Sequence, residues 1–242
     1  MHGKRLKKLK AVAPPGLVQE LVKLVEDYNT TPGGKFSLTN REQLRYYLGN
    51  CSSFIDFITG NNGNPEDYEP GFDYKYSWTH QRHLKCFFPN ALEKVFRYLT
   101  SKCEKRYHKY YFKKNFSSFE ELITTVRSLY PLKNTQTNLK GFGNLDSYDF
   151  SLRYAYSRSR NLLPKEYVYV DHGRTKDSAE MLYQLLPDFP EIIDGKIRFA
   201  DCPDWLKEFK TLGRTFIMYS KDIENFLCHY YDKIEELFDK YK

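Results

Sequence analysis

Apolar side chains recur at the three- and four-residue spacing of an α-helix in several separate segments of this 242-residue chain. The clearest stripe lies near the C-terminus and consists of Ile223, Phe226, Leu227, Tyr230, Ile234, Leu237 and Phe238. Another follows Pro14-Pro15-Gly16 and consists of Leu17, Leu21, Leu24, Val25 and Tyr28. A stripe of this kind is buried against another element in a folded protein. The periodicity therefore predicts packed α-helices.

Capping residues predict where further helices begin. Ser118 and Glu121 have the spacing of a capping box at the start of a helix. A helix is expected from Asn144 or Asp146 to about residue 156. Another is expected over residues 179–186, because Asp177-Ser178 precedes it and Pro187 follows it.

The remaining segments predict a mainly α fold with little or no sheet. A long basic helix is predicted over residues 91–113, and residues 165–170 are either a short strand or an extended loop. Residues 61–71 are dominated by Gly, Asn, Pro, Asp and Glu, which indicates a flexible loop or a domain boundary. We expect a single multi-helix domain over residues 1–242.

Composition excludes several classes of protein. The chain is 40% hydrophobic and 29% charged, which is typical of globular proteins and not of disordered or membrane proteins. No apolar run approaches the roughly 18 residues that would span a bilayer, and no secretory signal is recognised. The five cysteines are scattered, with no CxxC pair: Cys51, Cys86, Cys103, Cys202 and Cys228. We therefore expect a cytoplasmic protein with reduced thiols, no cofactor and no membrane partner.

The net charge of +7 comes with one concentrated basic run. Residues 94–114 contain one acid, Glu104, and eight bases: Lys94, Arg97, Lys102, Lys105, Arg106, Lys109, Lys113 and Lys114. Four tyrosines are interleaved with these cations. Such a segment either binds a polyanion such as nucleic acid or forms a solvated face. A second basic cluster, over residues 4–10, is expected to be flexible.

A glycine turn provides a candidate phosphate site. The sequence Leu139-Lys140-Gly141-Phe142-Gly143 precedes the helix expected from Asn144. Backbone amides at such a turn can hold a phosphate, although the turn could equally be an ordinary connection between helices. The segment resembles the hairpin of helix-hairpin-helix DNA-binding proteins. The resemblance implies that the amides of Gly141 and Gly143 contact DNA. Four arginines follow the turn and either extend this contact into a strip or form a solvated basic face: Arg153, Arg158, Arg160 and Arg174.

A second resemblance concerns residues 168–174, Val-Tyr-Val-Asp-His-Gly-Arg. This stretch is similar to one in helix-hairpin-helix DNA glycosylases, in which an Asp at the start of a helix supports the positive sugar and activates the nucleophile. The resemblance gives that role to Asp171, for which a loop ion pair or a helix cap is the alternative. Residues 141–182 also resemble a group of uncharacterised bacterial proteins, which implies an all-α fold within the hairpin-like segment 138–186 but no activity.

Two further sets of Cys and His residues are candidates for a functional site. His80, His83 and Cys86, with Cys103 and His108, could ligate zinc, or they could be half-buried core residues. Cys202 and His229 could form a nucleophile and its base.

The sequence therefore predicts a nucleic-acid-binding protein, with duplex DNA as the favoured ligand. The alternatives are a base-excision glycosylase that uses Asp171 and a protein-interaction module with no nucleic-acid role. The sequence leaves open whether the protein is an enzyme, whether it prefers DNA to RNA, which sequence it reads and its oligomeric state.

Overall fold

The computed structural model describes residues 7–30, 100–104, 109–112, 115–129 and 162–242 except residue 212, together with residues 144, 145, 147, 148, 151, 152 and 155. The chain divides into two compact units. Residues 1–35 and 165–242 form the terminal unit, and residues 36–164 form the inserted unit. The single domain over residues 1–242 stays a prediction, and the loop at 61–71 lies outside the described residues.

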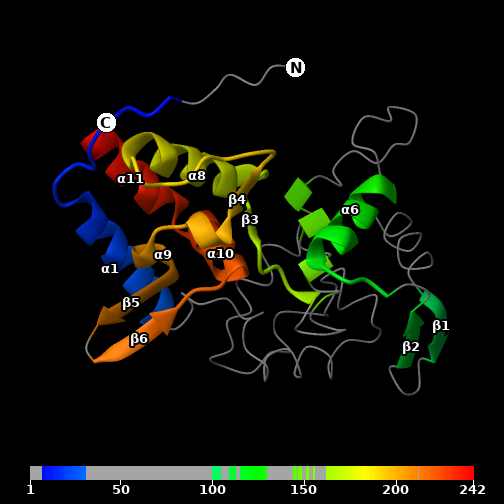
Figure 1. Ribbon diagram of the computed structural model, residues 1–242. Helices are drawn as coiled ribbons and strands as arrows, with labels where there is room; N and C mark the ends of the chain where they lie inside the picture. Colours follow the sequence, from blue (N-terminus) through cyan, green and yellow to red (C-terminus); the bar gives the residue numbers. More distant parts are fainter. Residues whose placement is uncertain are drawn as a thin grey trace, which may run out of the picture. The chain divides into compact units, whose positions relative to one another are not determined.

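The terminal unit combines helices with two small sheets (Figure 1). Its elements in chain order are α1 (Leu17–Thr30), β3 (Tyr167–Tyr169), α8 (Gly173–Leu185), β4 (Lys196–Arg198), the 3-10 helix η5 (Phe199–Asp201), α9 (Asp204–Lys207), β5 (Glu208–Thr211), β6 (Arg214–Ile217), α10 (Ser220–His229) and α11 (Tyr231–Tyr241). β3 pairs antiparallel with β4, and β5 pairs antiparallel with β6. α8 packs against both α10 and α11.

The described part of the inserted unit contains one complete helix and one strand pair. These elements are β1 (Thr100–Glu104), β2 (Lys109–Phe112) and α6 (Phe119–Leu129). β1 and β2 are antiparallel. Every described residue between 144 and 155 is helical, as expected.

The mainly α fold class is confirmed. Sheet structure in the described residues is limited to three separate two-stranded antiparallel sheets. None of the described helices is long and apolar enough to span a membrane.

The predicted capping box at α6 is present, with one difference. The Ser118 hydroxyl accepts a hydrogen bond from the backbone N–H of Glu121 at 3.1 Å. The Glu121 carboxylate reaches one residue further back and accepts from both the N–H and the hydroxyl of Ser117, each at 2.9 Å. Two donors at the helix start are thus satisfied, which explains why the helix begins at Phe119.

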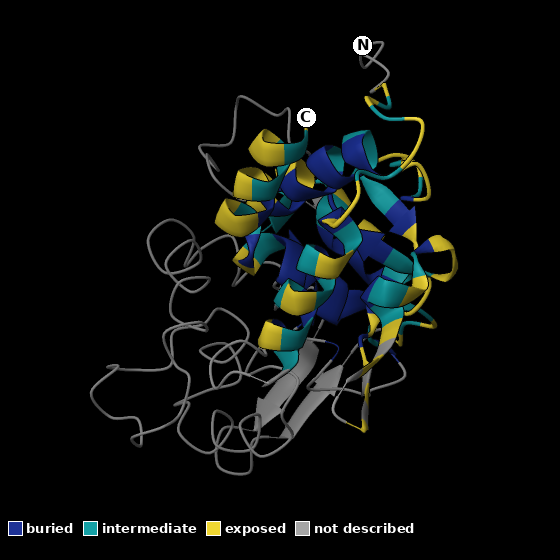
Figure 2. Cartoon of the chain, turned by 90° about the vertical axis from the view of Figure 1, so that its left-hand side faces the viewer, coloured by how far each residue is buried: buried dark blue, intermediate teal, exposed yellow. Residues whose placement is uncertain are grey.

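Aromatic rings form the centre of the terminal unit. Tyr28 of α1 is fully buried and meets Phe226 edge-to-face, with 5.9 Å between ring centroids. Phe226 stacks on Tyr230 at 5.2 Å. The Tyr230 hydroxyl donates to Asp27, so the outer end of this ring is held as well. Figure 2 shows the resulting pattern, in which buried positions face between the helices and exposed positions lie on their outer turns.

The C-terminal stripe is buried as predicted, but it belongs to two helices and not to one. Its residues from Ile223 to Ile234 are buried, while Leu237 and Phe238 are half-buried. The chain leaves α-helical geometry at Tyr230, where φ is −96° and ψ is 17°, and α11 starts at the next residue. The stacking of Tyr230 on Phe226 and its bond to Asp27 hold it at this break.

The helix predicted over residues 179–186 begins six residues earlier, at Gly173. Asp177 and Ser178 were expected to precede the helix, but both lie inside it. The Ser178 hydroxyl donates to the backbone carbonyl of Leu227 at 2.7 Å. Ser178 therefore joins α8 to α10 and is not an N-cap.

The basic helix predicted over residues 91–113 is wrong, because residues 100–112 contain the strands β1 and β2. A helix would align Lys102, Lys105, Arg106 and Lys109 on one face, where like charges three and four residues apart repel. In the sheet, Glu104 is the register partner of Lys109 on the neighbouring strand. The aromatic run Tyr110-Tyr111-Phe112 also favours a strand.

The N-terminal basic cluster was expected to be flexible, and its described part, residues 7–10, makes hydrogen bonds to the rest of the terminal unit. The backbone N–H of Leu9 donates to the carbonyl of Gln184 at 2.8 Å. The Lys8 ammonium donates to two carbonyls beyond the end of α8.

We predict that Phe226→Ala costs on the order of 3–5 kcal/mol of unfolding free energy, because a fully buried ring is lost from a packed aromatic cluster. Phe238→Ala is the matched control: the ring is half-buried, and a clearly smaller loss is expected. Chemical denaturation monitored by circular dichroism measures both. Equal losses would contradict this account of the core.

Candidate functional site

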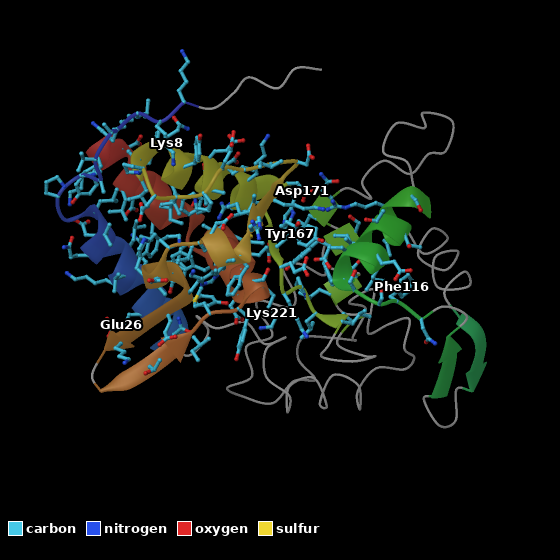
Figure 3. All side chains as sticks on the ribbon, in the orientation of Figure 1. Lys8, Glu26, Phe116, Tyr167, Asp171 and Lys221 are labelled. Atoms are coloured by element: carbon cyan, nitrogen blue, oxygen red, sulfur yellow. The ribbon has the colours of Figure 1, made fainter. Side chains whose placement is uncertain are left out.

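The junction between β3 and α8 carries the most unusual charged cluster among the described residues. The last two residues of β3 and the residue after it, Val168-Tyr169-Val170, are fully buried. The chain then passes through Asp171 to His172, which is the N-cap residue of α8. Asp171 is labelled at this junction in Figure 3, at the N-terminal end of α8. The side chain of Asp171 is 13% exposed, and that of His172 is buried.

His172 links two carboxylates that come from different parts of the chain. Its Nδ1 lies 3.1 Å from Oδ1 of Asp171, and its Nε2 lies 2.9 Å from Oε1 of Glu224 on α10. Glu224 is fully buried and also accepts a hydrogen bond from the Thr175 hydroxyl at 3.2 Å. We call Asp171, His172 and Glu224 the histidine–carboxylate cluster.

The electrostatics of this cluster keep His172 protonated. Burial by itself would lower the pKa of the imidazole, but the hydrogen bonds to Asp171 and Glu224 and the charges of both carboxylates outweigh it. Together they raise the pKa of His172 to about 10. At neutral pH the ring is therefore an imidazolium that donates from both nitrogens.

This protonation state decides what the cluster can do chemically. An imidazolium bonded on both sides cannot act as a general base at neutral pH. It holds the Glu224 side chain in place by a hydrogen bond and fixes the orientation of Asp171. Asp171 is the member of the cluster with the greatest side-chain exposure.

Gly195 packs against the backbone of the junction between β3 and α8. Its carbonyl accepts from the backbone N–H of Val170 at 2.8 Å, and its φ is +72°. A Cβ added at Gly195 would lie 2.2 Å from the Cβ of Asp171 and 3.1 Å from its Cα. Only glycine fits this position without a shift of the backbone.

A second buried ion pair lies at the start of α10. The Lys221 ammonium lies 2.7 Å from Oδ1 of Asp222, and both side chains are buried. Oδ2 of Asp222 accepts from the backbone N–H of Tyr219 at 3.0 Å, which caps the helix. The Ser220 hydroxyl donates to the carbonyl of Tyr167. These contacts fix the start of α10 against β3, while Glu224 fixes its middle against α8.

Three of the predicted nucleic-acid-binding residues are described. Arg174 is exposed one residue into α8, where it bonds to Asp232 at 3.3 Å and lies 5.2 Å from the Tyr231 ring centroid. The carbonyl of Asn144 accepts from the Ser147 hydroxyl at 2.9 Å. Lys109 is the first residue of β2. Arg174 and Asp171 lie in the same junction, but Arg174 is paired with α11.

The other predicted contact residues lie outside the described part of the chain: Lys105, Arg106, Lys140, Gly141, Gly143, Arg153, Arg158 and Arg160. Of the suggested zinc ligands, only the backbone of Cys103, in β1, is described. No group of three or more potential metal ligands occurs among the described residues.

Cys202 is not an activated nucleophile. Burial raises the pKa of its thiol to about 12, so the thiol is protonated at neutral pH. Its sulfur donates weakly to the carbonyl of Arg198 at 3.7 Å. His229, the suggested base, is exposed at the end of α10.

Sequence reasoning identified Asp171 and missed Glu224, to which His172 connects it. Glu224 lies in an amphipathic helix, where charged residues usually face solvent. One signal was present: two ionisable residues, Asp171 and His172, directly follow the hydrophobic run Val168-Tyr169-Val170. The pairing itself joins residues 52 positions apart, which no local pattern indicates.

No family model matches this chain, and neither a curated protein sequence nor a solved structure matches it. The functional proposal below therefore rests on the residues, charges and geometry of the chain itself.

We predict that Gly195→Ala destabilises the protein by on the order of 3 kcal/mol. The substitution has two costs. It places a methyl group too close to Asp171, and it puts a side chain on a residue with a positive φ, which strains the backbone. Gly213→Ala is the matched control, because Gly213 has nearly the same φ, +71°, and nothing within 4 Å of the added Cβ. Its cost should be only the backbone strain of about 1–2 kcal/mol. Thermal denaturation of both variants measures the difference, and equal costs would show that the junction tolerates the added methyl.

We also predict that His172 makes stability depend on pH above neutrality. Because its folded pKa of about 10 exceeds the ordinary 6.5, the stabilisation is fully present below about pH 6.5 and is lost as pH rises through about 10. Between these values the unfolding free energy should fall by about 1.4 kcal/mol per pH unit.

The measurement is the pH dependence of urea unfolding, compared with His172→Gln, which should lack this slope. His229→Gln, at the exposed histidine on α10, is the control and should keep it. A His172→Gln variant with the wild-type slope would exclude a protonated His172.

Proposed function

We propose that this protein binds nucleic acid, with duplex DNA as the ligand, through the cations of the inserted unit. The distribution of charge carries the proposal. Residues 36–164 contain 19 basic and 12 acidic side chains, a net charge of +7. Residues 1–35 and 165–242 contain 19 of each. The excess positive charge of the whole chain thus resides in the inserted unit, as in a segment adapted to a polyanion.

The strand pair β1–β2 supports a specific mode of contact. Because Glu104 pairs with Lys109, residues 105–108 connect the two strands, and this connection contains Lys105 and Arg106. Residues 100–114 include six bases against one acid. The major groove of B-DNA is wide enough to admit a two-stranded ribbon. We infer that the connection of this ribbon enters the groove or lies along its phosphates.

The glycine turn would add a phosphate contact. In this proposal the amides of Gly141 and Gly143 hold a phosphate, with Lys140 and Asn144 beside them. Such contacts position the protein on DNA and do not read its sequence.

A second candidate function, base excision, is favoured by the position of Asp171. The carboxylate lies directly before α8, is bonded to an imidazolium and is partly exposed. A carboxylate that stays charged beside a reacting sugar could stabilise the positive charge that develops when a base leaves. In this candidate function Asp171 stabilises the positive charge on the sugar, and the bound nucleic acid is the substrate.

We predict that replacing both Lys105 and Arg106 by Ala weakens duplex binding and flattens its dependence on salt. Each phosphate contact that is lost should reduce the slope of log K against log salt by about 0.9. Fluorescence titration of a duplex at several salt concentrations measures the slope.

The control replaces Lys233 and Lys242 by Ala. Both are exposed cations of the neutral terminal unit, each paired with an acid three residues away. This double variant should keep the wild-type slope. If both double variants flatten the slope equally, binding reflects overall charge and the ribbon is not the contact. If the wild-type protein does not bind duplex DNA at low salt, the proposed function is wrong.

Asp171→Asn separates the two candidate functions. It should leave duplex affinity unchanged, since the carboxylate makes no attractive contact with phosphate. An assay for base release from duplexes containing damaged bases then tests the second candidate: wild-type activity that Asp171→Asn abolishes supports it, and no release by the wild-type protein excludes it.

A further inference from the structure

The N-terminal arm, which we define as residues 7–13, docks on the terminal unit through its lysines. Lys8 is labelled on the arm beside α8 in Figure 3. Its ammonium donates to the carbonyls of Leu186 at 2.8 Å and Phe189 at 2.7 Å, and lies 3.9 Å from the Tyr183 ring centroid. The Lys10 ammonium donates to the carbonyl of Lys242 at 3.0 Å.

Two carbonyl oxygens and one aromatic ring surround the Lys8 ammonium. Carbonyls at the C-terminal end of a helix carry partial negative charge, and an aromatic face attracts a cation. Burial lowers the pKa of Lys8, against the charges of Asp188 and Glu191, which raise it. The side chain thus gives up water for two carbonyl oxygens and a ring.

The rest of the arm is held weakly. Leu9 is 51% exposed and Val12 is 78% exposed, so the arm buries little apolar surface. Besides the lysine contacts, the arm is held by the backbone hydrogen bond from the N–H of Leu9 to the carbonyl of Gln184. An element with few buried contacts opens at a small free-energy cost.

We propose that the arm is stored on α8 in the free protein and is released when a polyanion binds, so that Lys8 exchanges carbonyl partners for phosphates. The proposal rests on the proposed function. The arm has three lysines within residues 7–10, and no acidic residue occurs before Glu20. A phosphate carries a full negative charge, so the ammonium group gains an ion–ion attraction there that a neutral carbonyl does not provide. The carbonyls left behind become accessible to water.

Storage makes docking and polyanion binding compete. Every interaction that favours the docked arm must then weaken polyanion binding, and every polyanion must loosen the arm, because the two equilibria are linked. Docking of the arm on the terminal unit therefore inhibits polyanion binding by the lysines of the arm. Lys7 provides an internal comparison, since it is exposed on the same arm.

The test measures hydrogen exchange at the Leu9 amide by NMR in the full-length protein, with and without a saturating short duplex. We expect protection of this amide in the free protein and loss of protection with the duplex. Lys8→Met should lose the protection already in the free protein, while Lys7→Met should keep it.

Affinity provides the second measurement. Both variants lose one cation, so both salt slopes should fall by about 0.9. At a fixed salt concentration Lys8→Met should lose less affinity than Lys7→Met, because its arm no longer has to undock. Equal affinity losses, or a Leu9 amide equally protected with and without saturating duplex, would overturn the proposal.

If the wild-type protein does not bind the duplex, the proposed function fails by itself, and inorganic polyphosphate replaces the duplex as the probe. Loss of Leu9 protection with polyphosphate would then support the stored arm. Unchanged protection would overturn it.

Discussion

The imidazolium of His172 is the interaction on which the terminal unit depends. It lies between a carboxylate at the start of α8 and a fully buried carboxylate on α10, and it bonds to both. Without this partner the fully buried carboxyl group of Glu224 would have given up its water for the Thr175 hydroxyl alone, which is strongly unfavourable. The bond from His172 to Glu224 therefore ties the start of α8 to α10, the helix whose Phe226 packs against Tyr28.

The terminal unit uses its cations internally. Lys8 donates to the carbonyls of Leu186 and Phe189 beyond the end of α8, Lys221 pairs with Asp222, and Lys240 pairs with Glu20 at 2.7 Å. Equal numbers of acids and bases in this unit agree with such use. The inserted unit has seven more bases than acids, so its cations cannot all be matched by its own carboxylates. This difference is the physical reason for assigning the nucleic-acid contact to the inserted unit.

Local patterns in the sequence predicted the elements whose causes are local. α1 follows its apolar stripe, and α6 begins where Ser118 caps it, because periodicity and capping act within a few residues. The early start of α8 and the strands β1 and β2 could not be predicted in this way. The Ser178 hydroxyl donates to a carbonyl 49 residues away, and β1 is held by its pairing with β2. Asp171 was located from its motif, but Glu224 became part of the site only through the fold.

The discontinuity of the terminal unit affects how the chain is made. Asp27 of α1 accepts a hydrogen bond from Tyr230, 203 residues later, and Glu20 accepts one from Tyr241, 221 residues later. During synthesis α1 leaves the ribosome with its apolar stripe uncovered and cannot meet α10 and α11 until those two helices have been translated. The whole inserted unit is produced in that interval. The terminal unit therefore forms its core only after the inserted unit has been made, and the apolar stripe of α1 stays uncovered until then.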